Sequence, residues 1–172
     1  WTQVESLPLN DIEHQSLQGL MAGLRKMPTL LMNEATVWSK AIYPLLSLVA
    51  HKSIQTWMQV PLYAQYTKFE LEGIADGVLG KVVAGRVKYP YLVIVETKRG
   101  VEGKNPVFQL YAQLLAAARL NWEHDHQSPQ EIFGCYTIAD IWTLVRGEVA
   151  DIDTDVPTLR VEYSREYTEK TE

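Results

Sequence analysis

The chain has 172 residues, of which 47% are hydrophobic and 22% are charged, and its formal net charge is −5. This length and composition favour one domain over residues 1–172 with a sizeable core, and argue against two domains. The single cysteine, Cys135, excludes an internal disulfide and is expected to be a small buried core residue. No run approaches the roughly 18 apolar residues of a membrane span, and no signal-peptide pattern opens the chain. We therefore expect a cytoplasmic protein without a membrane partner.

Charge is distributed unevenly along the chain. Between Lys81 and Lys104 there are six basic residues and two acids, whereas residues 148–172 contain eight acids and three bases. The acidic segment is expected to be a solvated tail. Because phosphate binding requires Lys and Arg, the basic stretch is the part of the chain that favours a nucleic-acid partner.

The first third of the chain is expected to be helical. Capping residues and apolar spacing predict one helix over about 10–26 and a longer amphipathic helix over about 33–52, with Asn33 as its N-cap. Pro44 lies inside the second helix and cannot donate to the carbonyl of Lys40, so a kink or a break is expected there.

Strands are expected in the middle of the chain. Residues 54–63 favour a strand that Pro61 interrupts, and 67–79 favour a second strand. A short strand at 82–87 precedes an apolar strand at 91–98, which reads as covered on both faces.

The last third is expected to alternate between helix and strand. A glycine-containing loop over 99–105 leads to a Leu- and Ala-rich helix over 106–121. A hairpin is then predicted from strands at 131–139 and 141–145, followed by a short strand at 159–163 and a frayed end.

The strand at 91–98 ends in two charges, Glu96 and Lys98. Side chains at i and i+2 of a strand point to the same face, so these two groups project together. Charges at the end of a buried strand are costly unless something binds them, and a metal ion with a phosphate would do so. An ordinary ion pair at a strand end is the alternative interpretation.

Asp76 precedes Glu96 by twenty positions, which allows two neighbouring strands to bring both carboxylates side by side. Two hard oxygen donors with room for water are what Mg²⁺ prefers. Lys98 beside such an ion could orient the water or stabilise phosphate oxygens, which indicates hydrolytic phosphodiester cleavage. Alone, Asp76 between Gly73 and Gly77 would be interpreted as a turn residue.

These residues resemble the PD-(D/E)XK nucleases, which have the restriction-endonuclease-like fold. Residues 73–79 are similar to the strand that carries the first acid, and Glu96-Thr97-Lys98 is similar to the E-x-K element. Asn33-Glu34, at the start of the second helix, resembles the first helix of the nuclease domain of type I restriction enzyme subunits. The similarity covers a core of about residues 33–145, and Ala75 stands where the family name has proline.

The resemblance implies a mixed α/β fold, with a central mixed sheet flanked by helices. It implies Mg²⁺, for which Mn²⁺ can substitute, held by Asp76 and Glu96 with the backbone carbonyl of Thr97. Lys98 would lie near the attacking water, and Glu34 would support the metal or the water. Without the resemblance, Glu34 is explained as a first-turn acid favoured by the helix dipole.

The resemblance also implies a site glutamine on the helix after the E-x-K element. Gln109 and Gln113 both fit, and Gln109 is preferred by its distance from Lys98 along the chain. Its expected role is to position Lys98 or the DNA backbone. Without the resemblance, both glutamines would be expected to face solvent.

The function expected from these residues is Mg²⁺-dependent hydrolysis of DNA phosphodiesters by an endonuclease acting in restriction or DNA repair. The expected partners are DNA and either a second copy of the chain or other restriction-system subunits. The alternative is a catalytically inactive member of the fold that serves as a nucleic-acid-binding or protein-interaction module. The acidic net charge favours this alternative.

Overall fold

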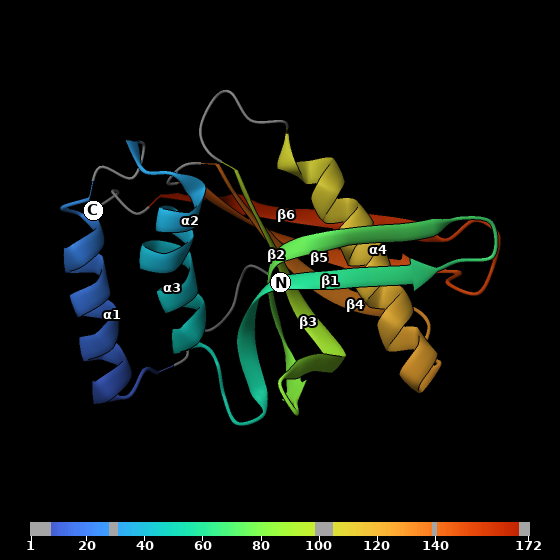
Figure 1. Ribbon diagram of the computed structural model, residues 1–172, viewed down its shortest axis with the longest axis horizontal. Coiled ribbons are helices and arrows are strands. Elements are labelled where there is room, and N and C mark those ends of the chain that lie inside the picture. Colours follow the sequence, from blue (N-terminus) through green and yellow to red (C-terminus); the bar gives the residue numbers. More distant parts are fainter. Residues whose placement is uncertain (1–7, 28–30, 99–104, 139–140, 169–172) are drawn as a thin grey trace.

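The computed structural model describes residues 8–27, 31–98, 105–138 and 141–168, and within them six strands form one sheet with helices packed against it (Figure 1). Three α-helices and one π-helical turn precede the strands, and one long helix lies between β3 and β4. The elements are α1 (Asp11–Leu24), α2 (Glu34–Val37), a π-helical turn (Trp38–Ile42), α3 (Tyr43–Leu48), β1 (Ile54–Gln65), β2 (Glu70–Val83), β3 (Arg86–Lys98), α4 (Pro106–Asp125), β4 (Gln130–Ile138), β5 (Ile141–Ala150) and β6 (Thr158–Thr168).

The sheet follows the order of the chain, from β1 at one edge to β6 at the other. Neighbouring strands are antiparallel except β3 and β4, which are parallel. A parallel pair needs a crossover connection, and α4 lies within it. The expectation of a mixed α/β protein with a central mixed sheet is therefore confirmed.

Helices cover both faces of the sheet. Ile94 and Val95 are neighbours in β3, and their side chains alternate between the two faces. Ile94 belongs to the larger buried cluster, with Leu114 of α4, whereas Val95 belongs to a smaller cluster with Trp38. Cys135 is buried in the smaller cluster, as expected from the sequence.

The first helix begins where its capping residues predict. The Asn10 side chain accepts hydrogen bonds from the backbone N–H groups of Ile12 and Glu13, and Glu13 accepts one from the N–H of Asn10. Reciprocal bonds of this kind form a capping box. Asn33 caps α2 in a similar way, through the N–H of Thr36.

The predicted irregularity near Pro44 is a π-helical turn directly before it. The N–H of Tyr43 donates to the carbonyl of Trp38, five residues earlier, and Pro44 then lies in the first turn of α3. A proline within a helix removes one intrahelical hydrogen bond and crowds the carbonyl four residues earlier, and the wider π turn lies at that position. The helix therefore continues through Pro44 and ends at Leu48, short of the expected end near Lys52.

The two edge strands, β1 and β6, are longer than expected, and so are β3 and β5 in the interior of the sheet. Pro61 does not interrupt β1, since an edge strand can turn the missing N–H away from its one neighbour. β6 pairs with β5 from Thr158 to Thr168, so most of the segment expected to be a short strand and a tail is a full edge strand. None of the described helices is long and apolar enough to cross a membrane.

Candidate active site

The end of β3 carries the charged pair that the sequence predicts. Lys98 Nζ lies 2.6 Å from Glu96 Oε1, so the two side chains project to the same side of the strand. The Glu96 side chain is completely buried, whereas that of Lys98 is 23% exposed. A buried carboxylate needs partners for both oxygens, and Lys98 supplies one of them.

The second partner of Glu96 comes from α4. Gln113 Nε2 donates to Glu96 Oε2 at 2.9 Å and is 3.3 Å from the carbonyl oxygen of Ile74. Gln113 is buried, whereas Gln109 is exposed and lines a neighbouring cavity of about 260 Å³. Of the two candidate glutamines, the structure therefore places Gln113, and not the preferred Gln109, against Glu96. Four residues correspond to about 6 Å along a helix, and the position at which α4 crosses the sheet places the later glutamine beside Glu96.

The charges around Lys98 are unbalanced. Burial raises the pKa of Glu96, and the opposing hydrogen bonds from Lys98 and Gln113 do not offset it. Burial lowers the pKa of Lys98, but the hydrogen bond and charge of Glu96, with the charges of Asp76 and Glu34, outweigh it and raise that pKa. One ammonium thus interacts with three acidic side chains, an arrangement that favours a further cation.

Asp76 is fixed in place by Thr97. The backbone N–H and the Oγ1 hydroxyl of Thr97 both donate to Asp76 Oδ2 at 2.8 Å. Gly77 pairs with Val95 in the antiparallel ladder between β2 and β3. Asp76, the residue before Gly77, therefore lies beside Glu96, near the end of β3. Thr97 was expected to contribute its carbonyl to a metal, and the contact observed is instead that its two donors orient the carboxylate.

A cavity of about 560 Å³ opens beside these groups. It brings together side chains from α2, from the π-helical turn and from the three strands β1, β2 and β3. Glu34 lines the cavity together with Asp76 and Lys98, although it is distant from both in the sequence. Its lining includes Glu34, Trp38, Met58, Gln59, Asp76, Thr97 and Lys98.

Trp38 forms one wall of this cavity because Gly77 has no side chain. A Cβ atom at Gly77 would lie 2.1 Å from Trp38 Cη2, whereas one at Gly73 would meet no atom within 4 Å. The sequence allowed either a bulge or a close backbone approach at these glycines. Close approach explains Gly77.

The carboxylates that could hold a metal are those of Asp76, which lines the cavity, and Glu96, which is buried behind it with Lys98 on one oxygen and Gln113 on the other. Asp76 Oδ2 is held by Thr97, and no hydrogen bond to Oδ1 is seen among the described residues. No three His, Cys, Asp or Glu side chains in the described part of the chain lie close enough to share an ion, so Glu34 does not form one ligand cluster with the other two. Mg²⁺ commonly takes one or two carboxylates and completes its octahedron with water and phosphate oxygens. The donor set fits that ion.

Sequence reasoning missed three contributions to the site: the wall formed by Trp38, the donors of Thr97, and the choice of Gln113. Only the glutamine left a signal in the sequence, as one of two candidates a helical turn apart. No family model matches the chain, and a search of curated proteins gave no significant match.

Proposed function

We propose that this protein is a cytoplasmic Mg²⁺-dependent endonuclease of the PD-(D/E)XK class, with a restriction-endonuclease-like core, that hydrolyses DNA phosphodiesters in restriction or DNA repair. The observation that carries the proposal is the completely buried Glu96, bound to Lys98 at 2.6 Å, beside Asp76 and an open cavity. A buried carboxylate with a raised pKa next to a specific cation is typical of functional sites.

Asp76 and Glu96 are the residues that would hold the ion. When bound, Mg²⁺ lowers the pKa of a coordinated water and neutralises charge on the phosphodiester. Thr97 holds one oxygen of Asp76 and leaves the other available, and Gln113 fixes the orientation of Glu96. Both are positioning residues, because each acts through a carboxylate.

Lys98 acts through its charge. Its pKa is raised above the ordinary value near 10.5, so it stays protonated at neutral pH and is a poor general base. An ammonium at the cavity wall can stabilise the negative charge that develops on phosphate oxygens as water adds and the P–O bond breaks. Glu34 lines the same cavity and can accept a hydrogen bond from the attacking water.

The test is cleavage of plasmid and oligonucleotide DNA with Mg²⁺ or Mn²⁺, measured on gels for the wild type and for Lys98→Ala. Loss of one electrostatic donor should lower the rate at least about 100-fold, while circular dichroism shows an intact fold. Lys68→Ala is the matched control, because Lys68 lies in an exposed ion pair with Asp155. This variant should cleave DNA at the wild-type rate. Full activity in Lys98→Ala would refute the proposal.

A catalytically inactive module is the second candidate. Two observations favour it: both oxygens of Glu96 already have hydrogen-bond partners, and the chain has an excess of acids. Mg²⁺ that binds Asp76 and Glu96 should raise the melting temperature in proportion to its binding, and Asp76→Asn should remove that increase. DNA binding without a metal-dependent shift in melting temperature, and without turnover on any substrate, would favour the module.

A further inference from the structure

The hairpin that joins β2 to β3 carries three exposed cations on one of its faces. Its register pairs Lys81 with Lys88 across the two strands. Arg86 lies two residues before Lys88 in β3, so all three side chains share a face, and each of them is exposed. Paired residues on neighbouring strands have Cβ atoms about 5 Å apart, and residues i and i+2 of a strand are about 7 Å apart. Three positive charges are therefore concentrated on this face.

The opposite face of the hairpin packs against the core beneath α4. Val87 is buried in the larger cluster, and Val82, which pairs with Val87, packs against that cluster. The three cations therefore lie on the other face of the sheet. On that face Trp38 packs over Gly77 and forms a wall of the active-site cavity, the cavity of about 560 Å³. The cations and the candidate active site thus share one face.

These cations have no acidic partner. In the described part of the chain, no carboxylate lies within ion-pair distance of any of them. Residues 77–95 contain no acid, and neither do residues 35–69, which include the neighbouring strand β1. Arg146 and Arg160, in the other half of the sheet, each bind a glutamate of a neighbouring strand. Like charges directly opposite each other in a sheet are destabilising, so an external anion would stabilise the lysine pair.

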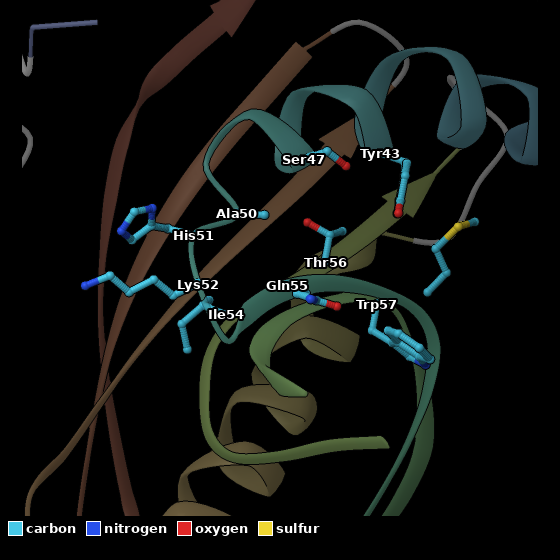
Figure 2. A pocket seen from close by; sticks show the side chains of 10 residues that line it. Tyr43, Ser47, Ala50, His51, Lys52, Ile54, Gln55, Thr56 and Trp57 are labelled. Atoms are coloured by element: carbon cyan, nitrogen blue, oxygen red, sulfur yellow. The ribbon is translucent and has the colours of Figure 1, made fainter. Parts of the chain in front are cut away.

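A fourth cation lies in the turn before β1. The N–H of Val82 donates to the carbonyl of Ser53 at 3.0 Å, so this turn adjoins the hairpin. Lys52 precedes Ser53, and Figure 2 shows its side chain extending away from Ser47 and Thr56. Those two residues line a cavity of about 580 Å³ between α3 and β1. Lys52 therefore borders the hairpin and not the interior of that cavity.

The charge on this face suits the phosphate backbone of duplex DNA. A duplex carries one negative charge per about 1.7 Å of its axis. Proteins that bind single strands combine cations with aromatic side chains on which the bases stack. Val83, which pairs with Arg86 on the cationic face, is exposed and aliphatic. The face thus provides contacts for phosphates and no ring for a base among Lys81, Val83, Arg86 and Lys88.

We propose that Lys81, Arg86 and Lys88 bind the phosphate backbone of a DNA duplex whose cleaved bond lies in the active-site cavity. Glu96 follows Lys88 by eight positions in β3. Eight residues of strand span at most about 26 Å, which is the length of about eight base pairs of duplex. The inference rests on the proposed function for its choice of DNA. It adds a binding surface and a substrate that stays double-stranded for up to about eight base pairs from the cleaved bond.

Fluorescence anisotropy in EDTA, with a labelled duplex of about 24 base pairs, tests this without turnover. The double variant Lys81→Gln/Lys88→Gln should bind at least about tenfold more weakly at 0.1 M salt, and its slope of log K against log salt should be shallower by about 1.8, because two phosphate contacts are lost. The matched control, Lys68→Gln/Arg160→Gln, removes the same net charge from exposed ion pairs and should bind like the wild type. All four side chains are exposed, so both variants should fold, which circular dichroism checks.

The outcomes separate this inference from the proposed function. If the wild type cleaves DNA but Lys81→Gln/Lys88→Gln binds and cleaves duplex like the control, the hairpin inference is wrong and the nuclease proposal stands. If nothing is cleaved but duplex binding depends on the two lysines, the nuclease proposal fails and the hairpin inference stands. A wild type that does not bind duplex, or that binds a single strand equally well with the same loss in the variant, would overturn the assignment of this face to duplex DNA.

Discussion

The face of the sheet under α4 and the face under α1, α2 and α3 share the same strands but are packed differently. Under α4, Leu110, Leu114 and Ile132 are completely buried in the larger cluster, and the cavity beside α4 measures about 260 Å³. The two cavities lined by α2 and α3 measure about 560 and 580 Å³. The smaller cluster around Trp38 is the packing that supports that side.

This difference assigns separate tasks to the two faces. Close packing under α4 provides stability, and it includes the contact that orients Glu96. The opposite face is open enough to admit a ligand and is held in shape by fewer buried side chains. Substitutions on the two faces should therefore differ in their effect on stability.

The largest expected effect comes from a matched pair of leucines. Leu114→Ala on the α4 face should lower the free energy of unfolding by about 3–5 kcal/mol, because a completely buried side chain leaves a cavity in a rigid cluster. Leu24→Ala, equally buried on the other face, should cost about 2–3 kcal/mol, because α1 can adjust. Urea unfolding followed by circular dichroism gives both values. A cost at Leu24 equal to that at Leu114 would remove the distinction between the faces.

The next effect concerns the wall of the active-site cavity. Gly77→Ala should destabilise the protein by about 1–3 kcal/mol, because the new methyl group displaces the Trp38 ring. Gly73→Ala in the same strand should change stability by less than about 1 kcal/mol, since nothing lies in its way. Cleavage should fall in Gly77→Ala and not in Gly73→Ala. Equal behaviour of the two variants would contradict the close packing of Trp38 on Gly77.

A smaller effect is expected from one buried hydroxyl. Tyr66 Oη donates to the carbonyl of Leu115 in α4 at 2.8 Å, and Tyr66→Phe should cost about 1 kcal/mol. Tyr63, which is 52% exposed, bonds to Gln65 and Glu70 at the surface, and Tyr63→Phe should cost less than about 0.5 kcal/mol. Thermal unfolding resolves the two, and a larger loss in Tyr63→Phe would contradict the prediction.

The smallest expected effect is a change with pH. Glu96→Gln keeps the shape of the side chain, and the buried Oε1 of Gln113, which has no partner among the described residues, could accept from the new amide if the Gln113 amide rotates. The raised pKa of Glu96 means that the folded state holds more protons than the unfolded chain above the ordinary value near 4.5. Wild-type stability from this group is therefore lost as pH rises through the raised pKa.

Glu96→Gln lacks this titration. Its free energy of unfolding, relative to the wild type, should rise as the pH increases above the ordinary glutamate value near 4.5 and through the raised pKa of Glu96. Urea denaturation in a pH series without divalent metal measures the difference. A constant difference across the series would show that burial does not perturb Glu96.

Much of the fold was predictable because its signals are local. The Asn10 capping box, the helix after Pro106 and the hairpin joining β4 to β5 all depend on residues close in sequence. The continuation of β1 through Pro61 was not predictable, because it depends on β1 being an edge strand. The length of β6 was not predictable either. Its charged side chains face solvent, as in a tail, while its backbone pairs with β5.

The site was predictable only where strand geometry determines it. Glu96 and Lys98 share a side because of the two-residue period of a strand, and they form the expected contact. Which of Gln109 and Gln113 contacts Glu96 depends on the position of α4 along its axis relative to the sheet. That position is determined by packing contacts along the whole helix. The bond from Thr97 to Asp76 depends on the register of β2 against β3, which no short motif encodes.

The π-helical turn sets the rotational phase of the helix that lines both cavities. Glu34 and Trp38 line the cavity of about 560 Å³ beside Asp76, while Tyr43 and Ser47 line the cavity of about 580 Å³ between α3 and β1. These positions are spaced by four, five and four residues, and the step of five is the π turn itself. In an uninterrupted α-helix each residue turns the chain by about 100°, so without the extra residue Tyr43 and Ser47 would be rotated away from β1. One inserted residue thus lets a single helical face line two adjoining cavities.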